Sequence, residues 1–206
     1  MRGSDRSLSL EAKLDKAMKI FWERGYYDTS IDRLMARSGL NRAVIYREFG
    51  NKKKLFEALL VRYRSIYIAE WTAPLAMPEA GLAQIEDFFR LIGSVEQQPG
   101  GRLGCLMCLT ASEVSPHVRS VERIVTNFLD DLRRLLRAAF VRAKERGEVR
   151  PTTDPDFVAD YAVGAVLGFW ALARSPASQD AVARYVEGGL TFLRNLEPVH
   201  GQGGAQ

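Results

Sequence analysis

The chain has 206 residues, of which 47% are hydrophobic, and this is enough apolar material for the core of one large domain or two small ones. Its formal net charge is +4, and its two cysteines exclude a disulfide-stapled fold and favour a reducing, cytoplasmic location. Met1–Ser9 is polar and no apolar run follows it, so we expect no secretory signal. The longest weakly polar stretch, Tyr161–Ala173, is too short to cross a bilayer, so we expect no membrane partner.

The first predicted helix begins at Leu10 and stops at Gly25, because apolar residues recur between them at helical spacing. Thr29 and Asp32 stand at the spacing of a capping box, which predicts a second, short helix that ends at Gly39. The N-terminal part of the chain is therefore expected to be helical.

A third predicted helix follows the glycine turn. Gly39 relieves the backbone strain of the turn, and Asn41 caps a helix that runs from Arg42 to Phe49. Two short helices around such a turn form a helix-turn-helix. We expect Val44, Ile45 and Phe49 to be buried. The outward face then consists of Arg42, Ala43, Tyr46 and Arg47, and a face of this kind fits the major groove of DNA.

Positive charge is concentrated in the same stretch. Arg42–Lys54 contains five basic residues and one acid, Glu48, so its net charge of +4 equals that of the whole chain. From Lys52 a further helix begins, and the lysines and free amides at its start suit a phosphate backbone. Helix pairs around a glycine also occur in all-α proteins that never bind DNA, and the outward basic residues favour the DNA-binding alternative.

The residue types predict separate roles on DNA. We expect Arg42 to read guanine, and Ala43 to permit close approach or to meet a thymine methyl. Thr29, Tyr46 and Lys52 are expected to position phosphates, because hydroxyls and an ammonium at helix ends suit that task.

The run from Ala17 to Leu59 resembles the N-terminal domain of the TetR family of bacterial transcription regulators. The matching residues, at fixed offsets, are Ala17, Phe21, Gly25, Tyr26, Thr29, Ser30, Ile31, Ser38, Gly39, Leu40, Ile45, Tyr46, Phe49, Lys52 and Leu55. The resemblance implies a ligand-responsive dimer that is usually a repressor of a palindromic operator. The DNA-binding set that we predict is Thr29, Asn41, Arg42, Ala43, Tyr46, Arg47 and Lys52.

One position departs from the family pattern. The family often has histidine where this chain has Glu48, and a carboxylate there is repelled by phosphate. Glu48 is expected to pair with Arg47 or a neighbouring lysine, or to accept a hydrogen bond from a cytosine amine.

Behind this region, apolar residues at helical spacing predict five more helices, over about 52–71, 82–92, 116–147, 154–175 and 178–196. The first should end before Pro74, and Pro116 should open the third. No stretch alternates with period two, so the predicted fold is all-α. We predict a three-helix DNA-binding domain over 1–54, followed by a helical effector-binding and dimerisation domain over 55–206.

The last two predicted helices are the candidates for a homodimer interface. Gly164 and Gly168 stand one turn apart, and Gly188 and Gly189 interrupt the final helix where a close partner fits. The alternative is that these glycines only let helices pack within one chain. The family resemblance implies the first interpretation, because paired C-terminal helices build a four-helix interface there.

The middle helices carry enough aromatic and sulfur-containing side chains to line a cavity for a small-molecule effector. The candidate effector-binding residues are Tyr67, Trp71, Phe88, Phe89, Cys105, Met107, Phe128, Tyr161 and Trp170. The alternative for most of them is a simple core position.

Cys105 and Cys108 form a C-x-x-C pair whose sulfurs would share one helix face. Zinc is a weak hypothesis, because His117 and His200 are isolated and no second pair occurs, so we predict neither metal nor cofactor. Buried apolar cysteine is the plain alternative. The segment GCLMCLTASE also resembles a TetR subgroup that includes sensors of oxidants or electrophiles, which implies such a role for Cys105.

Two rival functions follow from the same features. A helical C-x-x-C redox enzyme would need a strand-to-helix setting that the pattern lacks, and no catalytic triad or phosphate loop is present, so we do not predict an enzyme. A helical scaffold would show no salt-dependent DNA affinity. For signalling, we expect the helix over 52–71 to be the only long element that joins the DNA-binding part to the body.

Overall fold

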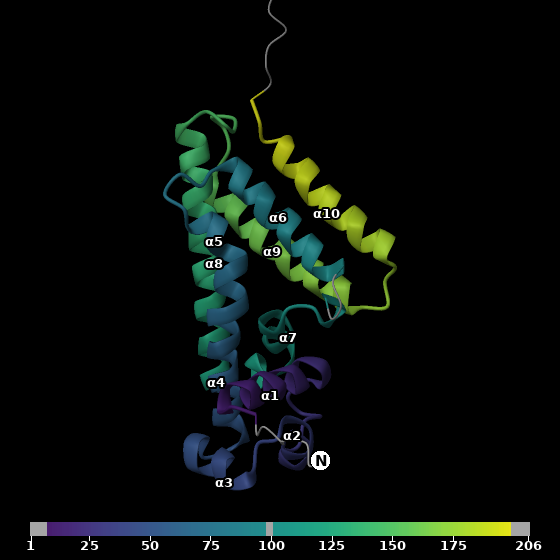
Figure 1. Ribbon diagram of the computed structural model, residues 1–206. Helices are drawn as coiled ribbons and strands as arrows, with labels where there is room; N and C mark the ends of the chain where they lie inside the picture. The colour runs from purple at the N-terminus through teal and green to yellow at the C-terminus, as the bar shows by residue number, and fades with distance from the viewer. Residues whose placement is uncertain (1–7, 98–100, 199–206) are drawn as a thin grey trace, which may run out of the picture. The chain divides into compact units, whose positions relative to one another are not determined.

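The computed structural model describes residues 8–97 and 101–198, and within these ranges the chain is helical with no strand (Figure 1). The predicted all-α fold is confirmed. The α-helices are α1 (Leu10–Arg24), α2 (Ile31–Ser38), α3 (Arg42–Val44), α4 (Lys52–Tyr63), α5 (Ala69–Ala76), α6 (Leu82–Gln97), α7 (Leu106–Glu113), α8 (Arg119–Glu145), α9 (Pro155–Arg174) and α10 (Gln179–Arg194). The short helices are the π-helices η1 (Ile45–Phe49) and η2 (Arg64–Ile68) and the 3-10 helices η3 (Gly101–Leu103) and η4 (Ser115–His117).

The described residues divide into two compact units. The first contains the chain up to Ile66 together with Cys105–Thr126, and the second contains Tyr67–Gly104 with the chain from Asn127 onward. The boundary predicted after residue 54 falls inside α4, and as a functional division it stays a prediction. Helix α8 has residues in both units, so the expectation that one helix alone would join the two parts is wrong.

The core of the first unit is an aromatic cluster beneath the helix-turn-helix. Phe21 of α1 lies 4.8 Å from Phe56 of α4, measured between ring centroids, and Tyr26 lies 4.9 Å from the same ring. Leu34 of α2 and Ile45 of η1 are fully buried in this unit. Helix α1 packs against α2 and α4, and α4 packs against α7. Burial of one face of each short helix therefore holds the motif together.

The capping box predicted at Thr29 and Asp32 is wrong by one residue. Ser30 is the N-cap of α2, with extended backbone angles, and its hydroxyl accepts a hydrogen bond from the Arg33 N–H at 3.2 Å. Thr29 is fully buried, and its hydroxyl donates to the Gly25 carbonyl at 2.7 Å. Thr29 thus closes the turn before α2 instead of capping the helix.

Both proline predictions for the later helices are also wrong. Helix α5 contains Pro74 and continues to Ala76. Pro74 has no N–H to donate, but it lies in the last turn of α5, so the lost backbone hydrogen bond is near the end of the helix. Pro116 lies in the separate 3-10 turn η4, and extended Val118 follows it, so α8 begins only at Arg119.

The second unit is built from longer helices. Helix α6 packs against α5 and α10, and α9 packs against α10 (Figure 1). Helix α9 begins at Pro155, with Asp154 as its cap as predicted, and its 20 residues are long and apolar enough to span a bilayer, unlike the shorter stretch considered from sequence. Seven of its residues, at helical spacing, are buried within the chain, so one face of α9 packs inside the unit.

Phe56→Ala should lower the free energy of unfolding by about 3–5 kcal/mol, because it leaves a cavity under the helix-turn-helix. The control is Val61→Ala on the same helix, where the side chain is 58% exposed, and this variant should stay within about 0.5 kcal/mol of the parent. Urea denaturation at one fixed protein concentration measures both. Equal effects of the two substitutions would contradict this account of the core.

Candidate nucleic-acid interface

The turn of the helix-turn-helix is fixed by local hydrogen bonds. Gly39 has φ of 78°, the left-handed conformation that glycine adopts without strain. The buried Ser38 hydroxyl donates to the Leu34 carbonyl at 2.6 Å and accepts from the Leu40 N–H at 3.1 Å. Asn41 then caps the next helix by accepting from the Val44 N–H at 2.8 Å. The direction of the recognition helix, Arg42–Phe49, is therefore set before its first turn.

The recognition helix is anchored through one buried residue. Ile45 is fully buried, while Val44 and Phe49 are only half-buried. The last five residues form a π-helical turn, which widens the helix after Val44. The solvent-exposed residues of this stretch are Asn41, Arg42, Ala43, Tyr46, Arg47 and Glu48. Arg42, Ala43, Tyr46 and Arg47 are the four that the sequence predicts on an outward face.

Acidic neighbours pair with both arginines of this face. Arg42 forms an ion pair with Asp32, and Arg47 Nε lies 2.7 Å from the Glu48 carboxylate, which is one of the three arrangements expected for Glu48. All four side chains are largely exposed, and exposed ion pairs contribute little free energy. A phosphate or a guanine edge can therefore replace either carboxylate at small cost.

Lys52 lies at the start of α4, on the ring of Tyr26. Its ammonium nitrogen is 4.2 Å from the ring centroid, which is a cation–π contact. Partial burial lowers the pKa of Lys52, and the carboxylates of Glu113 and Asp28 act in the opposite direction. Asn51 caps the helix by accepting from the Lys54 N–H. A cation and free helix N–H groups are thus presented together, which is the arrangement that binds phosphate.

Thr29 does not share this exposed position. Its side chain is buried and its hydroxyl is used by the Gly25 carbonyl, so the side-chain phosphate contact expected from sequence is not available. The physical reason is the shifted helix start, which turns Thr29 inward and leaves Ser30 at the surface.

One further residue was missed by the sequence interpretation. Glu113, at the end of α7, accepts hydrogen bonds from the backbone N–H groups of Tyr26 at 2.8 Å and Tyr27 at 3.1 Å. The partners are 86 and 87 positions apart in the chain, so no local pattern reveals them.

Two family models match this sequence. Residues 14–59 match the model described as bacterial regulatory proteins of the tetR family, and residues 85–188 match a tetracyclin repressor-like C-terminal domain. The chain is also 30% identical over 178 residues to the HTH-type transcriptional repressor ComR of Escherichia coli K12, covering 86% of this chain and 85% of that protein. The chain belongs to the TetR family of bacterial transcriptional regulators.

Solved structures of TetR regulators share the fold of this chain. One is a cysteine mutant of the TetR family regulator CifR in complex with a 26-base-pair operator DNA, with a TM-score of 0.79, 22% identity, and coverage of 90% of this chain and 97% of that one. Another is a TetR regulator from Chloroflexus aurantiacus, with a TM-score of 0.73, 26% identity, and coverage of 90% and 91%. The correspondence spans both compact units.

The candidate effector residues of this TetR-family chain are split between the units. Seven of them lie in the second unit: Tyr67, Trp71, Phe88, Phe89, Phe128, Tyr161 and Trp170. Trp71 and Trp170 stack at 5.4 Å, and Tyr67 lies 6.0 Å from Trp71. Tyr161 is 50% exposed and packs on Phe192, so it lies on the surface.

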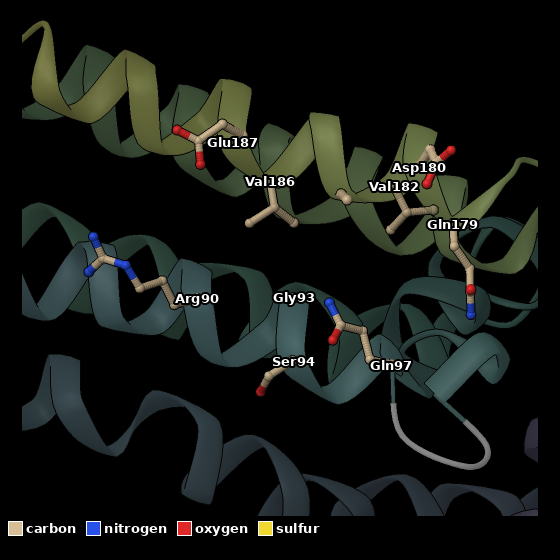
Figure 2. A pocket seen from close by; sticks show the side chains of 10 residues that line it. Arg90, Gly93, Ser94, Gln97, Gln179, Asp180, Val182, Val186 and Glu187 are labelled. Carbon is tan, nitrogen blue, oxygen red and sulfur yellow. The ribbon is translucent and has the colours of Figure 1, made fainter.

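An open groove between α6 and α10 of the second unit has a volume of about 600 Å³. Figure 2 shows Arg90 and Gln97 on the α6 side and Val186 and Glu187 on the α10 side. None of the predicted effector residues lines this groove.

Cys105 and Met107 belong to the first unit, where Cys105 precedes α7. Burial by itself raises the pKa of the Cys105 thiol, but hydrogen bonds with the Cys108 thiol, the Tyr63 hydroxyl and nearby backbone groups lower it below its usual value. The hydrogen bond to Cys105 and burial raise the pKa of Cys108. The two thiols are therefore hydrogen-bonded to each other and titrate as a coupled pair.

Proposed function

We propose that this chain is a dimeric, ligand-responsive repressor that binds a palindromic double-stranded operator in the cytoplasm and releases it when a small effector binds. The observation that carries the proposal is the recognition helix, which is anchored by Ile45 and exposes Arg42, Ala43, Tyr46 and Arg47 beside Lys52. The similarity to CifR, which has been solved in complex with operator DNA, and to the transcriptional repressor ComR supports it.

The exposed residues divide into two roles on DNA. Arg42 and Ala43, at the first turn of the recognition helix, are placed for base edges, with Arg42 reading guanine. Tyr46, Arg47 and Lys52 are placed for phosphates, and Asn41 lies beside them at the cap. Lys52 already lies on an aromatic ring, so less side-chain entropy is lost when it meets a phosphate.

An exposed apolar stripe on α9 and open space beside a glycine of α10 support dimerisation. Phe157 is 65% exposed and Tyr161 50% exposed, and Gly164 continues the same face of α9. A Cβ atom added at Gly164 or at Gly188 of α10 would meet no atom within 4 Å. Packing within one chain therefore does not require these two glycines, and close approach of a second chain explains them.

Gly168 and Gly189 are different, because Tyr185 and Phe89 of the same chain lie against them. The alternative of packing within one chain therefore applies to these two positions.

The operator is released if the effector has different affinities for two conformations that position the DNA-binding part differently. In a dimer, the recognition helices must meet half-sites about 34–36 Å apart, or a multiple of that distance. A displacement of a few Å in each subunit misaligns one half-site. We place the effector among the rings of the second unit, around the buried, stacked pair Trp71 and Trp170.

The test of the proposal is selection of bound duplexes from random DNA by the purified full-length chain, at two salt concentrations. We expect a palindromic site whose affinity falls steeply as salt rises. Recovery of no preferred duplex would refute sequence-specific repression, and affinity independent of salt would favour the scaffold alternative.

Arg42→Ala should relax the preference for guanine at one position of each half-site, with a loss of about 1–3 kcal/mol of discrimination. Competition binding with duplexes that differ only at that base pair measures it. Arg123→Ala, which removes the same charge from an exposed position of α8, is the control. If Arg42→Ala weakened all duplexes equally, Arg42 would be a phosphate contact.

Gly188→Arg should dissociate the dimer, because a long cationic side chain fills the space that the second chain needs. Sedimentation equilibrium should show the monomer mass, and operator affinity should fall with it. Ala183→Arg, on another face of α10, adds the same side chain and should leave the dimer intact. A dimeric Gly188→Arg variant would place the interface elsewhere.

The contact between the Cys105 and Cys108 thiols favours a second candidate, a regulator that senses oxidants or electrophiles through Cys105. Cys105→Ser should then abolish release of the operator by hydrogen peroxide or N-ethylmaleimide, while Cys108→Ser keeps a response. Fluorescence anisotropy of labelled operator measures release. An undiminished response in Cys105→Ser would eliminate the thiol sensor and leave the small-effector mechanism.

A further inference from the structure

The turn between α1 and α2 binds a carboxylate that comes from a distant part of the sequence. Oε1 of Glu113 accepts hydrogen bonds from two successive backbone N–H groups, those of Tyr26 and Tyr27, at 2.8 and 3.1 Å. Successive N–H groups that converge on one oxygen form an anion-binding nest. Glu113 occupies this nest from the end of α7, and all three residues belong to the first unit.

Glycine at position 25 fits this contact for two reasons. Its φ is +82°, and a Cβ atom there would lie 2.7 Å from both carboxylate oxygens of Glu113. The Gly25 carbonyl accepts from the buried Thr29 hydroxyl on the other side of the turn. The turn is therefore held at two points. The Thr29 hydroxyl binds the carbonyl of Gly25, and the Glu113 carboxylate binds the N–H groups of Tyr26 and Tyr27.

Tyr26 connects the Glu113 carboxylate to Lys52, one of the residues proposed to bind DNA. The Tyr26 ring packs on Phe56 and carries the Lys52 ammonium on its face. The charge of Glu113 favours the protonated form of Lys52. Displacement of Glu113 would therefore affect both the turn that leads into α2 and the cation at the start of α4.

We propose that Glu113 is a positioning residue for DNA binding, whose carboxylate fixes the α1–α2 turn and, through Tyr26, the placement of Lys52. The proposal rests on the operator-binding function proposed above. It also gives α7 a direct role in regulation, because any signal that withdraws the end of this eight-residue helix releases the turn.

The direction of the change in DNA affinity on removing Glu113 distinguishes a positioning role from simple repulsion between its charge and DNA. A carboxylate near DNA repels phosphate, so its removal strengthens binding if charge is its only contribution. If Glu113 positions the turn, its removal weakens binding in spite of the lost repulsion. Glutamine keeps an acceptor oxygen without the charge, so Glu113→Gln should preserve the turn.

The experiment compares Glu113→Ala, Glu113→Gln and the control Glu122→Gln in the full-length chain. Glu122 is an exposed carboxylate of α8 in the same unit. The duplex selected from random DNA is the probe. We expect Glu113→Ala to bind it roughly 3- to 30-fold more weakly. Glu113→Gln should bind as tightly as the parent or more tightly, and Glu122→Gln should match the parent.

Amide hydrogen exchange without DNA tests the contact independently. Tyr26 and Tyr27 should exchange faster in Glu113→Ala and keep their protection in Glu122→Gln. Unchanged exchange, or tighter DNA binding by Glu113→Ala, would overturn the proposal. If the parent selects no duplex while the exchange result holds, the operator-binding function fails and the contact with the turn stands. Circular dichroism confirms that each variant is folded.

Discussion

The recognition helix is too short to be stable without the rest of its unit. Arg42–Phe49 has eight residues, and isolated helices of this length do not persist in water. Its position depends on the burial of Ile45 and on the aromatic core formed by Phe21 and Phe56. Three small helices bury too little surface to stand alone, so α4 and the segment Cys105–Thr126 complete the first unit. The position of the proposed DNA-binding surface therefore depends on the helices of this unit that pack against the helix-turn-helix.

Two carboxylates connect this segment to the helices of the motif. The nearly buried Glu57 of α4 accepts from the Ser120 hydroxyl at 2.6 Å and from Lys54 at 2.8 Å, which joins α4 to the start of α8. Glu113 joins the end of α7 to the turn before α2. Hydrogen bonds to charged groups are among the stronger polar contacts in proteins. These contacts connect α7 and the start of α8 to the residues proposed to bind DNA, inside one compact unit.

Local chemistry made part of the site predictable. Gly39 and Asn41 predict the turn and the cap, because a left-handed backbone needs glycine and a free helix N–H within three residues needs an acceptor. The start of α2 was misplaced, because both Thr29 and Ser30 can cap and only packing turns Thr29 inward. Glu113 was not predictable, since its partners are distant in sequence and a single acid at a helix end has no periodic signal. In the second unit, spacing predicted the apolar faces, but only the folded chain shows which aromatic residues stack within it and which lie on the surface.

The proposed repressor dimer holds two recognition helices at a fixed separation on one operator. The most direct measurement is the affinity of the full-length chain for the selected duplex with five extra base pairs between the half-sites, about half a helical turn. This insertion should lower the affinity to that of a single half-site, and ten extra base pairs should restore part of it only if the subunits can separate. Equal affinity for the original and the five-base-pair variant would contradict the claim.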